Sequence, residues 1–334
     1  ALDTNDADGV MMVAMDAQNG EILSMVSLPN FDPNSFGDYS EEERKNSIVS
    51  TIYEPGSVFK MFSVAAFLEL GGITLADYFN TSGSYRDENA GFQITDLGDY
   101  GRINAEGIIK YSSNVGAAFA SETVSPDSFN QSLREFGFGE RTGITLNGEE
   151  RGLLRRPAGW SGRTQQTIAI GQEIGVTAIQ VATAATVFAN NGVLLRPRIV
   201  RKIVSPEGRT IELFSREPAR EVLSPSTAQL MLQLMESATQ GGGTARRLQV
   251  PGIRISAKTG TAEVYDPELG AYSPERFVAS CLAIFPTDNP RLIVYAVIIH
   301  PRGESIFGGQ IAVPLVRESA DFLVSYLDIP REGE

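Results

Sequence analysis

A serine and a lysine three positions apart form the first pair in this sequence that could carry out covalent chemistry together. Ser57 and Lys60 follow the chain-breaking dipeptide Pro55-Gly56, and the largely apolar segment 58–70 has the spacing of a helix. Residues three apart share a helical face, which brings the Lys60 amine within reach of the Ser57 hydroxyl. Unpaired N–H groups at the helix start favour negative charge on the serine oxygen. The pair could therefore act as nucleophile and base.

A lysine accepts a proton only when its pKa falls from the ordinary value of about 10.4, which burial can achieve. Phe59, Met61 and Phe62 flank Lys60 and could supply an apolar wall. The alternative is a serine that caps a helix and a lysine that lies on the surface. Because Ser-x-x-Lys alone is a common pattern, further residues must decide.

Two further motifs follow in the chain, Ser112-Ser113-Asn114 and Lys258-Thr259-Gly260-Thr261. The order S-x-x-K, S-x-N, K-T-G resembles the signature of penicillin-binding proteins and serine β-lactamases. Gly260 could simply weaken an edge strand, or its missing side chain could admit a substrate backbone. A second S-x-N triplet, 128–130, follows an apparent helix start at Ser125 and is rejected. The three motifs together favour a catalytic site.

The elements that must position these motifs are predicted as strands at both chain ends with helices between. Asn19-Gly20 predicts a hairpin of strands 10–17 and 21–27. Apolar runs at 254–265, 277–285 and 292–300 predict three more strands, which could complete one antiparallel sheet. A further hairpin is expected within 197–214. The expected helices are 58–70, 105–110, 116–121, 177–190, 227–239 and 313–327.

A sheet assembled from distant chain ends favours one interlocked unit over two serial domains. We expect a single domain over 1–334, with a sheet subdomain from about 1–55 and 245–334 and a mainly helical subdomain between them. The fold class is α/β in the broad sense (α+β), with a central five-stranded antiparallel sheet flanked by helices.

Composition excludes several classes of function. The net charge of −13 disfavours a nucleic-acid partner, which would require clustered Lys and Arg. One cysteine, Cys281, and one histidine, His300, exclude cysteine-cluster and poly-histidine metal sites, so no metal or cofactor is expected. Cys281 is expected in the core, while His300 could line the cleft. The longest apolar run, 292–299, is too short to span a bilayer.

Almost the whole chain resembles the class B penicillin-binding proteins, the monofunctional transpeptidases, and most closely their cell-division (septal) branch. Besides the three motifs, this resemblance rests on 13–32, 79–83, 136–139, Thr142-Gly143, 170–172, Val176-Thr177, Tyr53-Glu54-Pro55-Gly56-Ser57, Phe307-Gly308-Gly309 and Ala312-Val313-Pro314. The resemblance implies a peptidoglycan D,D-transpeptidase, with the penicillin-binding transpeptidase fold, that cross-links stem peptides and is inhibited covalently by β-lactams.

The resemblance also implies a role for each motif residue. Ser57 would attack the D-Ala-D-Ala bond after Lys60 takes its proton, and Ser112 would relay a proton to the departing D-Ala beside the positive Lys258. The implied oxyanion hole consists of the backbone N–H groups of Ser57 and Thr261. The implied substrate-binding residues are Asn114, for the donor amide, and Thr259, Gly260 and Thr261, for the strand and the terminal carboxylate.

The family's partners are stem peptides as donor and as amine acceptor, β-lactams, a membrane glycan polymerase and division proteins. Its members lie outside the cytoplasm, anchored by an N-terminal transmembrane helix. Because this chain begins at Ala1 without a signal peptide, we expect an excised piece of such a protein. Two alternatives remain: a β-lactamase or D,D-carboxypeptidase that passes the acyl group to water, and a non-catalytic β-lactam sensor.

Overall fold

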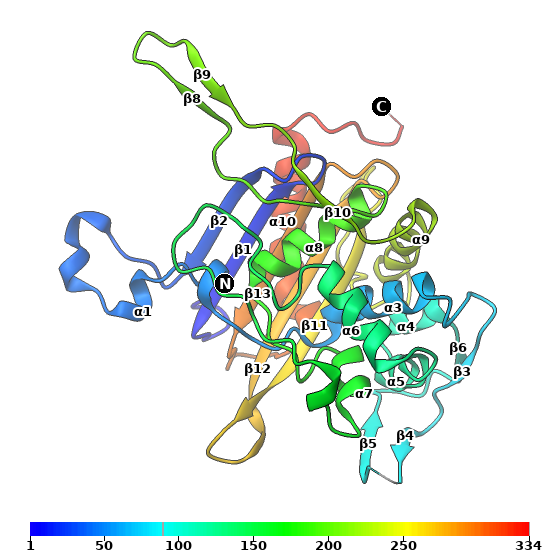
Figure 1. Ribbon diagram of the computed structural model, residues 1–334. Coiled ribbons are helices and arrows are strands. Elements are labelled where there is room, and N and C mark those ends of the chain that lie inside the picture. The colour runs from blue at the N-terminus through cyan, green and yellow to red at the C-terminus, as the bar shows by residue number, and fades with distance from the viewer. Residues whose placement is uncertain (89, 334) are drawn as a thin grey trace.

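Five strands from the two ends of the chain form one antiparallel sheet (Figure 1). The computed structural model describes residues 1–88 and 90–333 and orders the strands β11-β12-β13-β1-β2. Their bounds are β1 Gly9–Asp16, β2 Ile22–Leu28, β11 Ser256–Asp266, β12 Ala271–Phe285 and β13 Leu292–Ile299. The expected fold class is confirmed. In this sheet β11 pairs only with β12, so its other edge is unpaired.

The middle strand β13 shows why the sheet lies inside the molecule. Ile293, Tyr295 and Val297 point into one apolar core, while Val294 and Ile298 point into a second core on the opposite face. Helix α8, Ala178–Ala189, packs in the first core, and α10, Gly308–Tyr326, packs in the second. Figure 1 shows α10 behind the sheet and α8 in front of it. Because both faces of the sheet are covered, the sequence of β13 is a continuous run of apolar residues.

The last helix, α10, starts at Gly308, five residues before the predicted start at residue 313, and it contains Pro314. Glycines and a proline normally mark a helix boundary, which explains the late prediction. A Cβ on Gly308 would lie 2.3 Å from the Gly260 oxygen and 2.4 Å from the Ser280 oxygen. The glycine therefore lets the helix start pack directly on β11 and β12.

The remaining elements lie mostly between the two groups of strands. The helical ones are η1 Pro33–Asp38, α1 Glu41–Arg44, α2 Ser47–Ser50, η2 Gly56–Phe59, α3 Lys60–Glu69, α4 Ala105–Tyr111, α5 Asn114–Ser121, α6 Pro126–Glu135, η3 Pro157–Gly159, α7 Thr164–Ala169, α9 Pro225–Glu236 and η4 Ser237–Thr239. The short strands are β3 Phe79–Asn80, β4 Ser84–Asp87, β5 Phe92–Thr95, β6 Arg102–Ile103, β7 Val193–Leu195, β8 Lys202–Val204, β9 Thr210–Leu213 and β10 Pro218–Glu221. The division of 1–334 into one domain with two subdomains stays a prediction.

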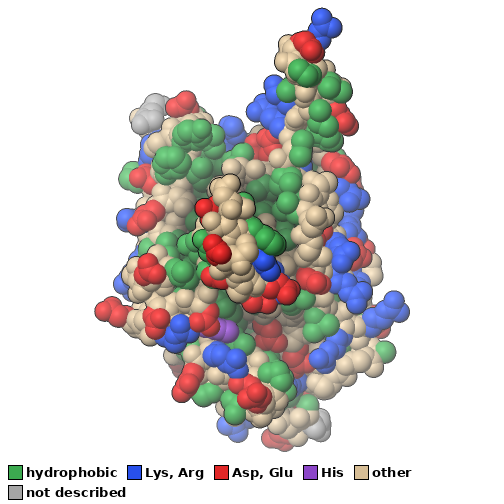
Figure 2. Space-filling view, turned by 90° about the vertical axis from the view of Figure 1, so that its left-hand side faces the viewer, with side chains coloured by type: hydrophobic (Ala, Val, Ile, Leu, Met, Phe, Trp, Pro, Cys, Tyr) green, Lys and Arg blue, Asp and Glu red, His purple; other side chains and the backbone are tan. Residues whose placement is uncertain are grey.

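The expected hairpin within 197–214 is present but short, as β8 and β9. It rises from the body in Figure 1 and stands at the top of Figure 2. Every residue of the two strands is exposed, so no buried face extends the pairing. On the face seen in Figure 2, blue and red side chains are interspersed over the body.

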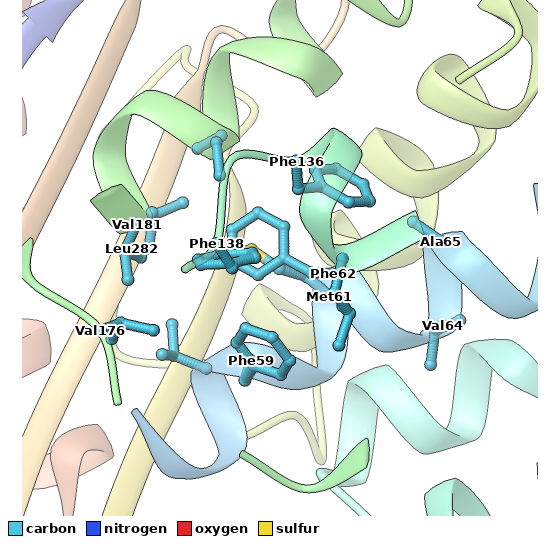
Figure 3. Close-up of a cluster of buried hydrophobic side chains, with 14 of the residues drawn as sticks. Phe59, Met61, Phe62, Val64, Ala65, Phe136, Phe138, Val176, Val181 and Leu282 are labelled. Atoms are coloured by element: carbon cyan, nitrogen blue, oxygen red, sulfur yellow. The ribbon is translucent and has the colours of Figure 1, made fainter. Parts of the chain in front are cut away.

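A cluster of aromatic rings anchors the helix that begins just after Ser57. Phe59 and Phe62 are fully buried, and their ring centroids lie 4.8 Å and 5.0 Å from that of Phe138. Phe62 also stacks on Phe188 of α8 at 5.7 Å. Figure 3 shows Phe59 and Phe62 grouped with Phe136 and Phe138 in this cluster. Aromatic contacts of this kind fix a helix against its neighbours.

We predict that Phe62→Ala lowers the free energy of unfolding by about 3–5 kcal/mol, because it opens a cavity in this cluster. Chemical denaturation measures the change. The matched control is Phe322→Ala on α10, where the side chain is 64% exposed and little stability should be lost. Equal losses in the two variants would contradict the structural role of the cluster.

Candidate active site

Three segments bring the predicted site residues together. Ser57 lies in the 3-10 turn η2, Ser112 lies between α4 and α5, and Lys258 lies in β11. The Lys60 Nζ is 2.9 Å from the Ser57 Oγ. The Lys258 Nζ is 2.8 Å from the Ser112 Oγ. The expected helix start at Ser57 is present as η2, which continues into α3.

The Lys60 amine is the centre of the site. It is fully buried and donates to the Ser112 carbonyl oxygen at 2.6 Å, to the Asn114 Oδ1 at 2.6 Å and to the Ser57 Oγ at 2.9 Å. Burial, and then the positive charge of Lys258, hold the pKa of Lys60 well below its usual range, while Asp96 acts in the opposite direction. In its neutral form the amine donates only two of these hydrogen bonds and uses its lone pair to accept the third, from the Ser57 hydroxyl, so it can take the serine proton.

Ser112 stands between two lysines because of an unusual backbone conformation. It ends α4 in the left-handed region, with φ of 62°, which few non-glycine residues adopt. Its Oγ is 2.8 Å from the Lys258 Nζ and 3.4 Å from the Lys60 Nζ. Burial lowers the pKa of Lys258 to about 7. The serine hydroxyl therefore connects two amines whose pKa values are both lowered by burial.

Asp96 holds the Ser112–Asn114 loop, and sequence analysis missed it. Its carboxylate accepts from the Ser113 Oγ at 2.5 Å, from the Asn114 N–H and from the Val115 N–H at 3.1 Å. These groups form the start of α5, where a negative charge is favourable. Because Asp96 comes from the turn after β5, eighteen positions before Asn114, no local spacing signals the contact.

Gly260 is required by the close approach of β11 to the serine turn. A Cβ there would lie 2.4 Å from the Ser280 Oγ, 2.9 Å from the Pro55 oxygen and 3.1 Å from the Val58 nitrogen. Sequence analysis had considered a weakened edge strand or an opening for a substrate backbone. The structure gives a different reason, since the strand itself packs against the segment that carries Ser57.

The two threonines of β11 point away from the face that carries Lys258. Thr259 is 6% exposed, and its Oγ1 donates to the Thr244 Oγ1 at 2.8 Å. Thr261 is half-buried, and its Oγ1 accepts from the Gly308 N–H at 3.1 Å. Asn114 likewise has a second contact, because its Nδ2 donates to the Thr95 oxygen at 3.0 Å. Thr244 belongs to none of the sequence motifs, so the sequence did not predict its contact with Thr259.

His300 and Cys281 have structural surroundings. The His300 Nδ1 is 2.8 Å from the Asp8 Oδ2, and Arg302 pairs with the same carboxylate. Cys281 lies in the sheet opposite Thr259, and burial raises the pKa of its thiol to about 12. Within residues 1–88 and 90–333, no group of His, Cys, Asp and Glu could hold a metal ion. Among these residues no helix is long and apolar enough to cross a bilayer.

We predict that Asp96→Ala speeds amide exchange in 113–116 by at least about tenfold, because three hydrogen bonds at the start of α5 are lost. Asp96→Asn keeps one carbonyl oxygen and should give an intermediate rate. Asp99→Ala, a nearby carboxylate that accepts from Ser82 and Gly101, is the matched control. Exchange measured by mass spectrometry that is unchanged in Asp96→Ala would contradict the assignment.

Comparisons with known proteins agree with this geometry. Residues 10–321 match the family model of the penicillin binding protein transpeptidase domain. The chain is 33% identical over 340 residues to penicillin-binding protein PbpB of Mycolicibacterium smegmatis, covering 99% of this chain and 52% of that protein. It is 34% identical over 307 residues to the probable peptidoglycan D,D-transpeptidase PenA of Neisseria flavescens, covering 92% and 73%.

Solved structures give the same result. Penicillin binding protein 3 of Mycobacterium tuberculosis, complexed with aztreonam, superposes with a TM-score of 0.90 and 31% identity, covering 99% of this chain and 75% of that one. The chain spans about half the length of the PbpB relatives, 52% in M. smegmatis and 50% in M. tuberculosis. The chain belongs to the penicillin-binding protein transpeptidase family, in the cell-division branch of class B.

Proposed function

We propose that this chain is the catalytic domain of a peptidoglycan D,D-transpeptidase that forms a Ser57 acyl-enzyme and that β-lactams acylate at the same residue. The observation that carries the proposal is the 2.9 Å contact between the Ser57 Oγ and a fully buried Lys60 amine. The naming of the Neisseria and Caulobacter relatives as probable peptidoglycan D,D-transpeptidases supports the reaction class.

In the first step Lys60 takes the hydroxyl proton while the Ser57 oxygen attacks the carbonyl carbon of the penultimate D-Ala. The carbonyl oxygen becomes an oxyanion, for which the backbone N–H groups of Ser57 and Thr261 are the proposed donors. Each such donor lowers a barrier of this kind by about 3 kcal/mol. The closeness of η2 to β11, seen at Gly260, supports a pair of donors from these two segments.

In the second step the C–N bond breaks and the terminal D-Ala leaves as an amine. The proton it needs passes from Lys60 through the Ser112 hydroxyl, which lies 3.4 Å from the Lys60 Nζ. Lys258, at 2.8 Å from the same hydroxyl, supplies positive potential. The amine of a second stem peptide then attacks the ester, and Ser57 recovers its proton as the cross-link forms.

The unpaired edge of β11 suits an extended donor peptide, which can add as a further strand. In this proposal Asn114 holds the donor amide, and must exchange its bond to Lys60 for one to substrate. Thr259 and Thr261 bind the terminal carboxylate. Thr261 contributes more of this contact, because Thr259 is nearly buried and bonded to Thr244.

The cellular setting belongs to the proposal too. We propose a location outside the cytoplasm, a role in septal wall synthesis, and association of the longer protein with a membrane glycan polymerase and division proteins. Two solved structures of one relative, penicillin binding protein 3 of M. tuberculosis, are complexes with aztreonam and ampicillin. This supports β-lactams as ligands here.

We predict that a fluorescent penicillin labels the protein and does not label Ser57→Ala, because the attacking oxygen is gone. Ser128→Ala, at the exposed first position of the second S-x-N triplet, should label at the normal rate. The bound label should persist for hours, whereas turnover within seconds would favour the β-lactamase or carboxypeptidase alternative. Label retained by Ser57→Ala would place the nucleophile elsewhere, and labelling without peptide cross-linking would favour the sensor.

We also predict a bell-shaped dependence of the labelling rate on pH. The rate should rise as the pH passes the lowered pKa of Lys60, since only the neutral amine accepts the serine proton. It should fall above pH of about 7, where Lys258 loses its charge. Lys60→Met should lower the rate at least about 100-fold, and Lys258→Met should remove the fall at high pH. A profile that rises monotonically in the wild type would contradict the role of Lys258.

A further inference from the structure

Glu54 is a buried acid close to the nucleophile that none of the proposed steps uses. It stands three positions before Ser57, and its Oε1 accepts from the Glu173 N–H at 2.9 Å and from the Tyr272 hydroxyl at 3.3 Å. Its Oε2 is inaccessible and has no hydrogen-bond partner within the part of the chain that the structure describes. One carboxyl thus joins three segments that are far apart in sequence.

These three segments form one side of the site. Gly56, two residues after Glu54, donates to the Gly171 oxygen at 2.9 Å, and a Cβ on Gly171 would lie 2.0 Å from the Gly56 oxygen. Tyr272 belongs to β12 and pairs with Tyr265 near the end of β11. Figure 1 shows these two strands extending past the body on the side where α7 lies. Thr261 lies four residues before Tyr265 on the same strand, β11.

The charges around Glu54 favour its neutral form. Burial raises the pKa of Glu54 to about 7, and the negative charge of Glu173 acts in the same direction. The bonds from Glu173 and Tyr272 and the charge of Arg163 oppose this rise. Arg163 is mainly committed to Glu173, at 2.9 Å, so it neutralises the second acid rather than the first. A buried Oε2 without a donor tolerates a proton much better than a negative charge.

We propose that Glu54 is a positioning residue. In its neutral form its carboxyl holds the β12 extension and the 171–175 loop against the turn that carries Ser57, and we call this set of contacts the latch. The inference rests on the proposed function for its effect on acylation. When Glu54 ionises, its Oε2 must accept a hydrogen bond from water or from another donor, and the negative charge of Glu173 repels the Glu54 carboxylate. The β12 extension and the 171–175 loop then move away from the serine turn. The site is then best ordered below neutral pH.

Acylation kinetics provide the main test. Glu54→Gln resembles the neutral acid, since it keeps the accepting oxygen and cannot ionise. We expect the ratio of the wild-type labelling rate to the Glu54→Gln rate to be close to one at a pH of about 6 and to fall at least about threefold by a pH of about 8. Lys60 and Lys258 are common to both proteins, so their ionisations cancel in the ratio.

Two more variants sharpen this test. Tyr272→Phe removes the hydrogen bond that joins Glu54 to β12, so the ratio of its labelling rate to that of the Tyr272→Phe/Glu54→Gln double variant should fall less with pH than the wild-type ratio does. Glu318→Gln, an exposed glutamate on α10, receives the same chemical change and should give a ratio of one at every pH. A wild-type to Glu54→Gln ratio that does not change with pH overturns the proposal.

Stability gives a readout that needs no acylation. Because the folded-state pKa of Glu54 lies above its unfolded value, the proton stabilises the fold fully below a pH of about 4.5, and this contribution is lost as the pH rises through about 7. The wild-type melting temperature should therefore fall relative to that of Glu54→Gln over this range, and amide exchange in 171–175 should rise.

The two hypotheses fail in different ways. If the wild type is never labelled, the proposed function fails while the melting and exchange data still decide on the latch. If labelling is normal but neither the rate ratio nor the melting difference changes with pH, the latch fails alone. Glu54→Ala should be labelled about tenfold more slowly at every pH, because it lacks the accepting oxygen. If labelling is preserved in Glu54→Gln but slowed in Glu54→Ala, the slower rate reflects lost positioning of the serine turn and not a general loss of folding.

Discussion

The burial of one lysine amine sets the constraint on which the rest of this structure depends. An ammonium group away from water is costly, and a carboxylate in contact with it would stabilise the charge and remove the base. Around Lys60 the contacting acceptors are instead uncharged: a hydroxyl, a carbonyl oxygen and an amide oxygen. Asp96 is the nearby negative charge, and its oxygens are bound by the start of α5. The fold therefore supplies three hydrogen-bond acceptors to the amine without an ion pair.

Supplying those acceptors requires fixed backbone positions in two separate segments, the turn that carries Ser57 and the Ser112–Asn114 loop. The aromatic cluster of Phe59, Phe62 and Phe138 fixes α3, and Asp96 fixes the Ser112–Asn114 loop. Glycines permit the approach of β11 to the serine turn and of α10 to β11. Packing thus determines the surroundings of the amine, because a shift of the Ser112–Asn114 loop would remove two of its hydrogen-bond acceptors.

The sequence predicted what local patterns encode. The Asn-Gly turn, the apolar strands and the helix after Pro55-Gly56 each depend on neighbouring residues. Each was found within a few positions, except that β12 begins at Ala271, six positions before the predicted start at residue 277, because its first residues are polar and exposed or half-buried for the most part. The chain order of the three motifs predicted their convergence through resemblance. Asp96 was not singled out, and Glu54 was quoted only as part of the Tyr53–Ser57 segment, because their partners are distant, up to 218 positions away for Tyr272. The start of α10 was misplaced because Gly308 serves a tertiary contact that overrides helix propensity. The roles of the site residues stay predictions.

The order of the strands has a consequence for how the molecule is made. The first hairpin, β1 with β2, needs β13 as its neighbour, yet β13 begins 276 positions after β1 ends, at Leu292. During synthesis Val13 and Met15 lack their β13 partners until Leu292–Ile299 has left the ribosome. Contacts across such separations form slowly and leave apolar surface exposed meanwhile. Assembly of the candidate site is consequently a late event, and Ser57 is synthesised long before Lys258 can join it.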